Sequence, residues 1–546
     1  MSIGTTVPIT PVPPATPAAA VSLSSASELP ALSSAEAHST LAMISLAAPA
    51  HTPAARLPLE VVAVVDRSGS MGGPKMQTMK QTLRFLVEKG LQSGDSLSLV
   101  AFDDTVDTRL PLTTMDAAGK KSALEAVDNM HPGRTTNLSG GLLQGLDLLQ
   151  RAPPPAGGST RAVLLFTDGI ANCGITSGPG ILEAAQGAMA GGPVTTIFTF
   201  GFGEGHNEDM LRALSQATNG LYYFIDKVET IPQAFADCLG GLVAVVAQNA
   251  TLVLTPAEQE GGAATIAHVH SSYKRTAAAD GSGAVELSLG DIYAEDEKDV
   301  LVQLSLPALP APLAEEGVGA GASPCLHATL RYYSVPTSRF ESVSTTLNVA
   351  RPLATPAQQP LNLKLEAQRM RVAAAEAMAR AAQLADAGRL DEGRAELQRC
   401  RDATLSSPAM AAGGSEQCAA LVADLSRVAT GYESAREYER WGGKMAKMSA
   451  MSHCQQRSNH VTGGAYEKAS KRASKAAWTM GPSSAPPPRA AAAAAGPPSQ
   501  PAFAPQQFLQ QQQFVQQQQL VQKPAESTES AARPQSAGWF GWMRSA

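Results

Sequence analysis

An apolar run, Leu59 to Val65, dictates much of what this chain can fold into. A continuous stretch of valine and leucine of this length is typical of a strand buried on both faces of a parallel sheet. It ends at Asp66, which is followed at alternate positions by Ser68 and Ser70, with glycines that let the backbone turn tightly. Alternate spacing can direct these three side chains into one cup at the carboxyl end of the strand. Their oxygen atoms suit a small divalent cation such as magnesium.

Two later segments carry polar residues for the same cup. A second buried-strand run, Arg161 to Thr167, also ends in an acid followed by glycine, and Asp168 is that acid. Between the two strands lies a polar loop, Gly133 to Leu138, which leads into an amphipathic stretch. Either of its adjacent threonines, Thr135 or Thr136, can offer a further hydroxyl. Together the three segments predict an oxygen-lined metal site.

The order D-x-S-x-S, then T-N, then T-D-G, resembles the von Willebrand factor type A domain and its metal-ion-dependent adhesion site. Five residues match that motif position by position: Asp66, Ser68, Ser70, Thr136 and Asp168. The resemblance implies that hydroxyls bind the cation (Mg2+, or Mn2+ or Ca2+) directly, while at least one aspartate acts through water. It also implies that a protein partner donates an acidic side chain to the open coordination position. Thr135 remains the alternative to Thr136.

Strand-like and helix-like segments alternate from Leu59 to about Val246. The expected strands are 59–65, 95–102, 161–167, 195–200 and 221–225. The expected helices are 75–89, 117–128, 139–150, 181–190, 208–217 and one that ends near 246. This alternation predicts an α/β domain over 58–246, with a doubly wound, mostly parallel sheet that helices cover on both faces. Ligands of such sheets bind at the carboxyl edge of the strands, where the cup lies.

The pattern changes twice after this domain. Residues 247–352 contain short alternating segments between Gly, Pro and acidic turns, which predict an antiparallel β-sandwich to which segment 41–46 could add a strand. Residues 360–478 are rich in good helix formers and predict three antiparallel helices, at 365–387, 390–404 and 416–438. The Pro/Ala/Ser-rich leader 1–38 and the Pro/Ala/Gln-rich tail 481–546 are expected to be disordered.

This domain order resembles the non-RING part of the plant wavy-growth-type RING ubiquitin ligases, including the Vwaint segment that follows their type A domain. The resemblance spans about 40–480. The residues that carry it are Gly290 to Glu297, Val300 to Leu306, Gln368 to Ala379 and Glu396 to Arg401. The six cysteines are scattered and include no C-x-x-C pair, so the chain has no RING cysteines and ligase activity does not carry over.

Several other functions are disfavoured by the sequence. Phosphoryl transfer would call for G-x-x-x-x-G-K-[ST] or a D-x-D motif, and neither accompanies Asp66, so no enzyme is expected. The loop Gly201 to Gly205 lacks dinucleotide-loop spacing, and we expect the adjacent His206 to cap a helix or line the rim of the site. The basic stretch 436–478 carries no recognised nucleic-acid motif, so its charges are expected to solvate helices rather than bind nucleic acid.

The remaining observations concern location and role. No Lys or Arg precedes Arg56, no apolar run reaches about 18 residues, and free thiols are expected, which together favour a cytoplasmic protein without a transmembrane segment. The leading hypothesis is a divalent-cation-dependent protein-binding module on an intracellular multi-domain scaffold. The alternative is a partner-recognition component for ubiquitin ligation without its own RING. Nothing in the sequence indicates the oligomeric state.

Overall fold

The computed structural model describes residues 20–50, 56–153, 155, 158–258, 263–278, 281–309, 322–355, 357–412 and 415–456. The start of the expected leader, the end of the expected helical segment and the tail 481–546 lie outside these residues. By internal contacts the chain divides into a large unit, 1–189 with 194–484, and a second unit, 190–193 with 485–546. All contacts described below lie within the large unit. None of the described helices is both long enough and apolar enough to cross a membrane.

A six-stranded sheet forms the centre of the α/β domain, in the order β5-β4-β3-β6-β7-β8. Its strands are β3 (Leu59–Asp66), β4 (Ser96–Phe102), β5 (Val106–Thr114), β6 (Thr160–Thr167), β7 (Thr196–Phe202) and β8 (Tyr222–Ile225). All neighbouring pairs are parallel except β4 with β5. The predicted doubly wound, mostly parallel sheet is therefore confirmed. The antiparallel edge strand β5 was missed, because its alternating polar residues and Pro111 hide the strand pattern.

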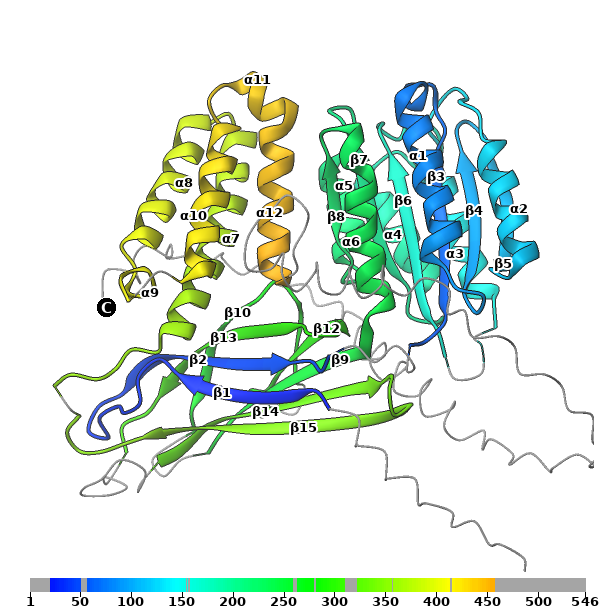
Figure 1. Ribbon diagram of the computed structural model, residues 1–546. Coiled ribbons are helices and arrows are strands. Elements are labelled where there is room, and N and C mark those ends of the chain that lie inside the picture. The colour runs from blue at the N-terminus through cyan, green and yellow to red at the C-terminus, as the bar shows by residue number, and fades with distance from the viewer. Residues whose placement is uncertain are drawn as a thin grey trace, which may run out of the picture. The chain divides into compact units, whose positions relative to one another are not determined.

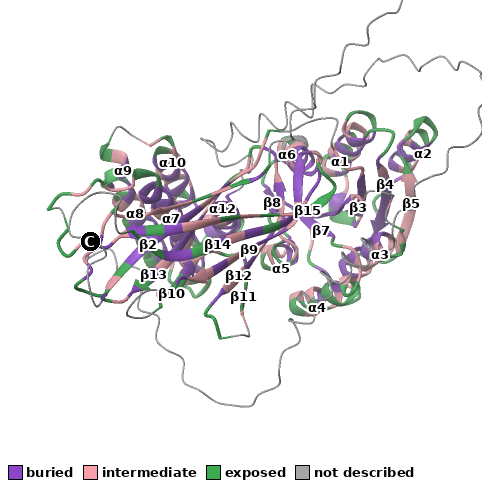
Figure 2. Ribbon diagram, turned by 90° about the horizontal axis from the view of Figure 1, so that it is seen from below, coloured by how far each residue is buried: buried purple, intermediate pink, exposed green. Residues whose placement is uncertain are grey.

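Helices cover both faces of this sheet (Figures 1 and 2). They are α1 (Pro74–Phe85), α2 (Ala117–Asp128), α3 (Leu138–Arg151), α4 (Gly178–Met189), α5 (Glu208–Gln216) and α6 (Ile231–Val243), with short helical turns η2 (Gly69–Met71), η3 (Leu86–Gly90) and η4 (Val228–Thr230). Every residue of β3, β6 and β7 is buried, which explains their continuous apolar sequences. Figure 2 shows this buried centre.

Two antiparallel sheets form the sandwich, in the orders β1-β2-β13-β10 and β11-β12-β9-β14-β15. Its strands are β1 (Ser22–Ser27), β2 (His38–Ala47), β9 (Val245–Pro256), β10 (Thr265–His270), β11 (Lys274–Ala277), β12 (Val285–Tyr293), β13 (Glu297–Leu306), β14 (Ala322–Ser334) and β15 (Arg339–Ala350). The segment 41–46 does join the sandwich, as part of β2. The α/β domain is thus inserted between β2 and β9, which are strands of the same sandwich.

Strand β1 corrects the expectation of a disordered leader up to residue 38. Residues Ser22–Ser27 pair with β2 along their whole length, and Leu23 packs against the sandwich core. Four of the six residues of β1 are serines, a composition that is typical of disordered segments. The strand forms because β2 pairs with it, and composition alone does not reveal such a partner.

The helical segment contains α7 (Leu363–Asp386), α8 (Leu390–Leu405), α9 (Pro408–Ala411), α10 (Glu416–Thr430), α11 (Ala435–Glu437), η5 (Tyr438–Gly442) and α12 (Gly443–Gln455). The third expected helix, 416–438, ends early, at Thr430. A Cβ atom on Gly431 would lie 2.4 Å from the Cα atom of Gly442. The backbone segments at Gly431 and Gly442 therefore pack too closely for a side chain at this position. The chain then forms α12 from the basic region that was expected only to solvate helices.

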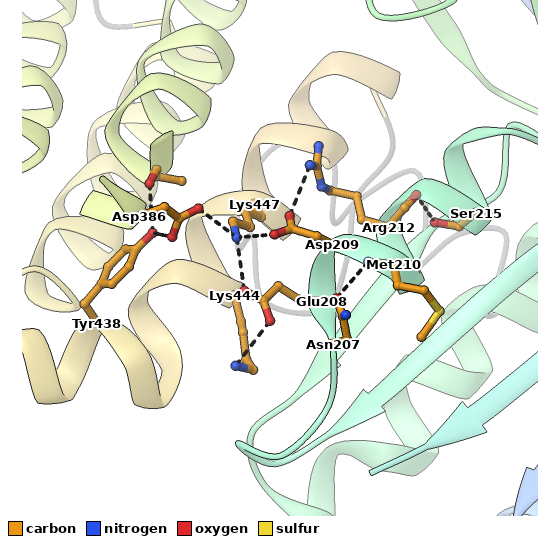
Figure 3. A network of polar contacts seen from close by, with 11 residues as sticks. Asn207, Glu208, Asp209, Met210, Arg212, Ser215, Asp386, Tyr438, Lys444 and Lys447 are labelled. Atoms are coloured by element: carbon orange, nitrogen blue, oxygen red, sulfur yellow. Dashed lines mark hydrogen bonds and ion pairs between the residues drawn. The ribbon is translucent and has the colours of Figure 1, made fainter. Parts of the chain in front are cut away.

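Two lysines of α12 are buried against the first turn of α5 (Figure 3). The Nζ atom of Lys447 lies 3.0 Å from Glu208 Oε1, 2.9 Å from Asp209 Oδ2 and 3.1 Å from Asp386 Oδ2. Lys444 Nζ lies 3.4 Å from Glu208 Oε2. Burial lowers the pKa of Lys447, but Asp209 and Glu208 outweigh it and hold that pKa above its ordinary value. These basic residues therefore bind the α/β domain.

The same helix covers the edge strand β8. The backbone N–H of Phe224 donates to Met448 Sδ at 3.2 Å, and Gln455 Nε2 donates to the carbonyl of Gly220 at 3.1 Å. An uncovered edge strand is a site for unwanted strand pairing, so α12 protects this side of the sheet.

We predict that Lys447→Met loosens α12, because it leaves three carboxylates without their shared cation. The expected cost is about 1–3 kcal/mol of unfolding free energy. Urea unfolding and hydrogen exchange of the α12 amides would measure it. Arg440→Met is the control, since Arg440 is half-exposed and its ion pairs are long, at 3.7 and 3.8 Å. Equal effects of the two substitutions would contradict this account.

Candidate metal centre

Asp66 is the last residue of β3 and is fully buried. Its Oδ1 atom accepts a hydrogen bond from the backbone N–H of Ser68 at 2.8 Å, and Oδ2 accepts one from the Thr167 hydroxyl at 2.6 Å. The second bond joins the ends of β3 and β6, which are neighbouring parallel strands. Both carboxylate oxygens of Asp66 are therefore held in place before any ligand binds.

The two serines connect Asp66 to the second aspartate. Ser68 is buried and Ser70 is exposed, with their Oγ atoms 3.1 Å apart. The Ser70 hydroxyl donates to Asp168 Oδ1 at 2.7 Å. Asp66, Ser68, Ser70 and Asp168 thus form one connected group, as the sequence predicted they would lie.

Lys75 contacts this group, although the sequence analysis did not assign it to the site. Lying in the first turn of α1, it places Nζ 2.5 Å from Asp168 Oδ2. Its side chain is about one-third exposed, whereas that of Asp168 is fully buried. The available signal was its position just after the glycine turn that follows Ser70. Lys75 supplies positive charge to Asp168.

Thr136 lies beside Asp168 and differs from its neighbour Thr135 in burial. Thr136 is buried and Thr135 is exposed. The Thr136 N–H donates to Asn172 Oδ1 at 2.8 Å, and its carbonyl accepts from the N–H groups of Asn172 and Cys173 at 3.1 and 3.3 Å. A side chain built on Gly169 would lie 3.4 Å from Thr136 Oγ1. The Thr136 hydroxyl therefore lies next to the Asp168-Gly169 turn.

The electrostatics of the cup favour a bound cation. Burial raises the pKa of Asp66, and the charge of Asp168 adds to the rise, although hydrogen bonds from Ser68 and Thr167 oppose it. The described residues contain no cluster of three or more His, Cys, Asp or Glu side chains suited to a metal. The donor set is instead two carboxylates with hydroxyls. Such hard oxygen donors fit Mg2+, Mn2+ or Ca2+.

The loop Gly201 to Gly205 also borders the cup. A side chain on Gly205 would lie 3.0 Å from the Asp168 carbonyl oxygen. The next residue, His206, neither caps α5 nor lines the rim as expected, since Asn207 is the capping residue and the His206 ring is buried. Its Nε2 atom lies 2.7 Å from the Tyr222 hydroxyl. This loop therefore connects the cup to the N-terminus of α5.

Comparison with known proteins agrees with this architecture. Residues 60–237 match the family model of the von Willebrand factor type A domain. The E3 ubiquitin-protein ligase WAV3 of Arabidopsis thaliana is 32% identical over 273 residues, covering 47% of this chain and 32% of WAV3. Inter-alpha-trypsin inhibitor heavy chain H3 of Mus musculus is 31% identical over 169 residues, covering 30% of this chain and 19% of that protein. This chain thus spans a third or less of either relative's length.

Among solved structures, a von Willebrand factor type A protein from Catenulispora acidiphila matches with a TM-score of 0.57 and 17% identity. The match covers 75% of this chain and 89% of that chain. At this identity it shows a shared fold.

We predict that His206 causes the free energy of unfolding to decrease as the pH is lowered. Burial, aided by Lys444, lowers the pKa of His206 to about 4, against about 6.5 when unfolded. Between these values the unfolded chain binds more protons, so stability present above pH 6.5 is lost as the pH falls toward 4. His206→Phe should remove up to about 3 kcal/mol of that dependence. Urea unfolding across pH 4–7 measures it.

The matched control for this prediction is His327→Phe, because His327 is exposed on the sandwich. It should leave the pH dependence as in the unmodified chain. An unchanged dependence in His206→Phe would contradict the prediction.

Proposed function

We propose that this chain binds a protein partner through a divalent cation, because residues 60–237 are a von Willebrand factor type A domain. We assign the cation to Asp66, Ser68, Ser70, Thr136 and Asp168. The observation that carries the proposal is the meeting of these residues from three separate segments at the carboxyl edge of the sheet. Type A domains mediate protein–protein interaction, which supports a binding role rather than catalysis.

The hydrogen bonds of the cup suggest how the ligand roles divide. Both oxygens of Asp66 already accept hydrogen bonds, which supports a role through water, with the hydroxyls of Ser68, Ser70 and Thr136 as direct ligands. A bound Mg2+, Mn2+ or Ca2+ supplies positive charge and an open position for a partner's carboxylate. Lys75 would then share Asp168 with the cation, or release it.

A second function is favoured by the extent of the similarity to WAV3. The alignment covers 273 residues, whereas the type A match over 60–237 covers 178, so the similarity extends beyond that domain. As the alternative, we propose a partner-recognition component for ubiquitin ligation without its own RING. Proximity labelling would separate the two functions by whether ubiquitin-conjugating machinery is recovered.

We predict that Mg2+ stabilises the full chain, because a ligand that binds only the folded state shifts the unfolding equilibrium. At a hundredfold excess over Kd the gain is about 2.7 kcal/mol. Thermal melts in Mg2+ and in chelator would measure it, with Asp66→Ala as the control that should show no shift. Identical melts of the unmodified chain in both conditions would count against a metal site.

We also predict that the five ligand positions differ in effect. Asp66→Ala and Asp168→Ala remove negative charge and should abolish Mg2+ binding, whereas Ser68→Ala, Ser70→Ala and Thr136→Ala each remove one neutral oxygen and should weaken it less. Thr136→Ala should reduce partner capture more than Mg2+ affinity, because the partner needs the cation in correct geometry. Titration calorimetry and pull-down of the partners found by proximity labelling would measure both effects.

Thr135→Ala is the matched control for Thr136→Ala, since it removes the same hydroxyl one residue away. It should change neither property strongly. If Thr135→Ala were the damaging change, the loop assignment would be off by one residue. If Asp66→Ala still captured partners fully, the binding surface would lie elsewhere.

A further inference from the structure

Two histidines lie at alternate positions of β10, the last strand of its sheet, which pairs with β13. His268 and His270 flank Val269, whose side chain is buried in the core of the sandwich. Since successive side chains of a strand point to opposite faces, both histidines face away from that core. His268 is exposed and His270 is half-buried. The two imidazoles therefore share one outer face at the edge of the sandwich.

An irregularity in β10 gives the two histidines this orientation. The register with β13 shifts between Ile266 and His268, which indicates a β-bulge. Ile266, before the shift, packs against the sandwich core, and regular alternation from there would direct His268 toward the core as well. Bulges re-aim side chains in this way next to functional sites. The bulge thus brings to the surface a pair of imidazoles that a regular strand would bury.

The spacing of the two imidazole rings suits a single shared cation. The ring centroids of His268 and His270 lie 4.7 Å apart, and the ring planes meet at 72°. A metal–nitrogen bond of about 2.0–2.1 Å places a cation roughly 3.2 Å from the centroid of the imidazole that binds it. Two imidazoles that bind one cation at an angle of about 90–110° therefore have centroids roughly 4.5–5.2 Å apart. The observed separation lies within this range.

A glutamate of the helical segment lies beside one of the rings. Glu376 belongs to α7, and its Oε1 atom lies 3.9 Å from His270 Nδ1. Histidines that bind metals usually direct their second ring nitrogen at a carboxylate or carbonyl, which fixes the tautomer and makes the other nitrogen a better ligand. Glu376 is placed to do this for His270, and Nε2 of His270 is then the nitrogen that binds the cation.

The donor set indicates the class of cation. Imidazole nitrogens suit Zn2+, Cu2+ and Ni2+, whereas Mg2+ and Ca2+ prefer oxygen. Burial, and to a smaller extent His270 and Arg275, lowers the pKa of His268, although Glu376 opposes them. A lowered pKa favours the neutral imidazole that metals require. The described residues form no group of three or more His, Cys, Asp or Glu ligands, so water completes the coordination and the cation can exchange.

We propose that His268 and His270 together bind a divalent transition-metal cation of the Zn2+ class, and that Glu376 is the positioning residue of His270. The site differs from the cup around Asp66 and Asp168 in its residues and in its ligand chemistry, because nitrogen replaces oxygen. It joins the sandwich to the helical segment, since β10 supplies the ligands and α7 supplies Glu376. The inference stands independently of the proposed function.

Calorimetric titration of the full chain with Zn2+ tests the proposal, in a large excess of Mg2+ that keeps Zn2+ out of the cup. His268→Gln and His270→Gln should each remove one equivalent of Zn2+ binding. His327→Gln is the matched control, because His327 is an exposed histidine on another strand of the sandwich, β14, and it should keep the Zn2+ affinity of the unmodified chain. Glu376→Gln should weaken Zn2+ binding about 10–100-fold, as expected for a residue that orients a ligand.

Electron paramagnetic resonance with Cu2+, added at less than one equivalent, counts the nitrogen ligands directly. The unmodified chain and Glu376→Gln should both show the superhyperfine lines of two nitrogens, whereas His268→Gln and His270→Gln should show fewer. An unchanged nitrogen count together with a lower affinity in Glu376→Gln distinguishes a positioning residue from a ligand.

Three results would overturn the inference. Undiminished Zn2+ binding in the double variant His268→Gln/His270→Gln would place the cation elsewhere. Zn2+ binding that appears only without Mg2+ would assign the cation to the cup. Unchanged Zn2+ affinity in Glu376→Gln would remove the role of that residue. None of these results bears on the Mg2+ response of Asp66→Ala, so a failure of this inference is distinguishable from a failure of the proposed function.

Discussion

Two carboxylates buried at the ends of adjacent strands impose a requirement that the surrounding structure must meet. Asp66 and Asp168 lie where β3 and β6 end, away from bulk water, and their mutual repulsion must be balanced. Hydroxyls, a backbone N–H and the ammonium group of Lys75 converge on them for this purpose. The glycine turns, the loop of Thr136 and the start of α1 are all arranged around that requirement.

The contacts of α12 show the same principle in a different place. Glu208 and Asp209 begin α5, and lysines from a distant part of the chain neutralise them. Burial raises the pKa of Glu208, whereas Lys447 and Lys444 lower it. The effect of the lysines is larger, so this pKa lies below its ordinary value. Since Asn207, His206 and Gly205 connect α5 to the backbone of Asp168, the loop that precedes α5 contacts both the helical segment and the cup around Asp66 and Asp168.

Local pattern was sufficient for the parts of the fold whose environment is uniform. The fully buried strands β3, β6 and β7 and the helices α2 and α3 were predictable, because burial on all sides imposes a continuous apolar run and one-sided burial imposes helical periodicity. Asp66 and its partner residues were predictable from motif spacing at strand ends.

What sequence could not reveal depended on distant partners. Serine-rich β1 is a strand only because β2 lies beside it. The sequence predicts that the lysines of α12 are solvated, but they are buried in the fold, because their partners Glu208 and Asp209 lie more than 200 residues away. The ion pair of Lys75 with Asp168 was missed for the same reason, because ion pairs between distant segments leave no periodic pattern in the sequence.

The insertion of the α/β domain between β2 and β9 has a consequence for the order of folding. Ser45 in β2 pairs with Asp299 in β13, so closing this sheet joins positions 254 residues apart. Contacts so remote in sequence form slowly, whereas the inserted domain is rich in neighbouring strand–helix contacts. During synthesis β1 and β2 emerge first, yet they must wait for β13. We therefore expect the inserted domain to complete its own core while the sandwich is still open, and its folding to bring the two halves of the sandwich together.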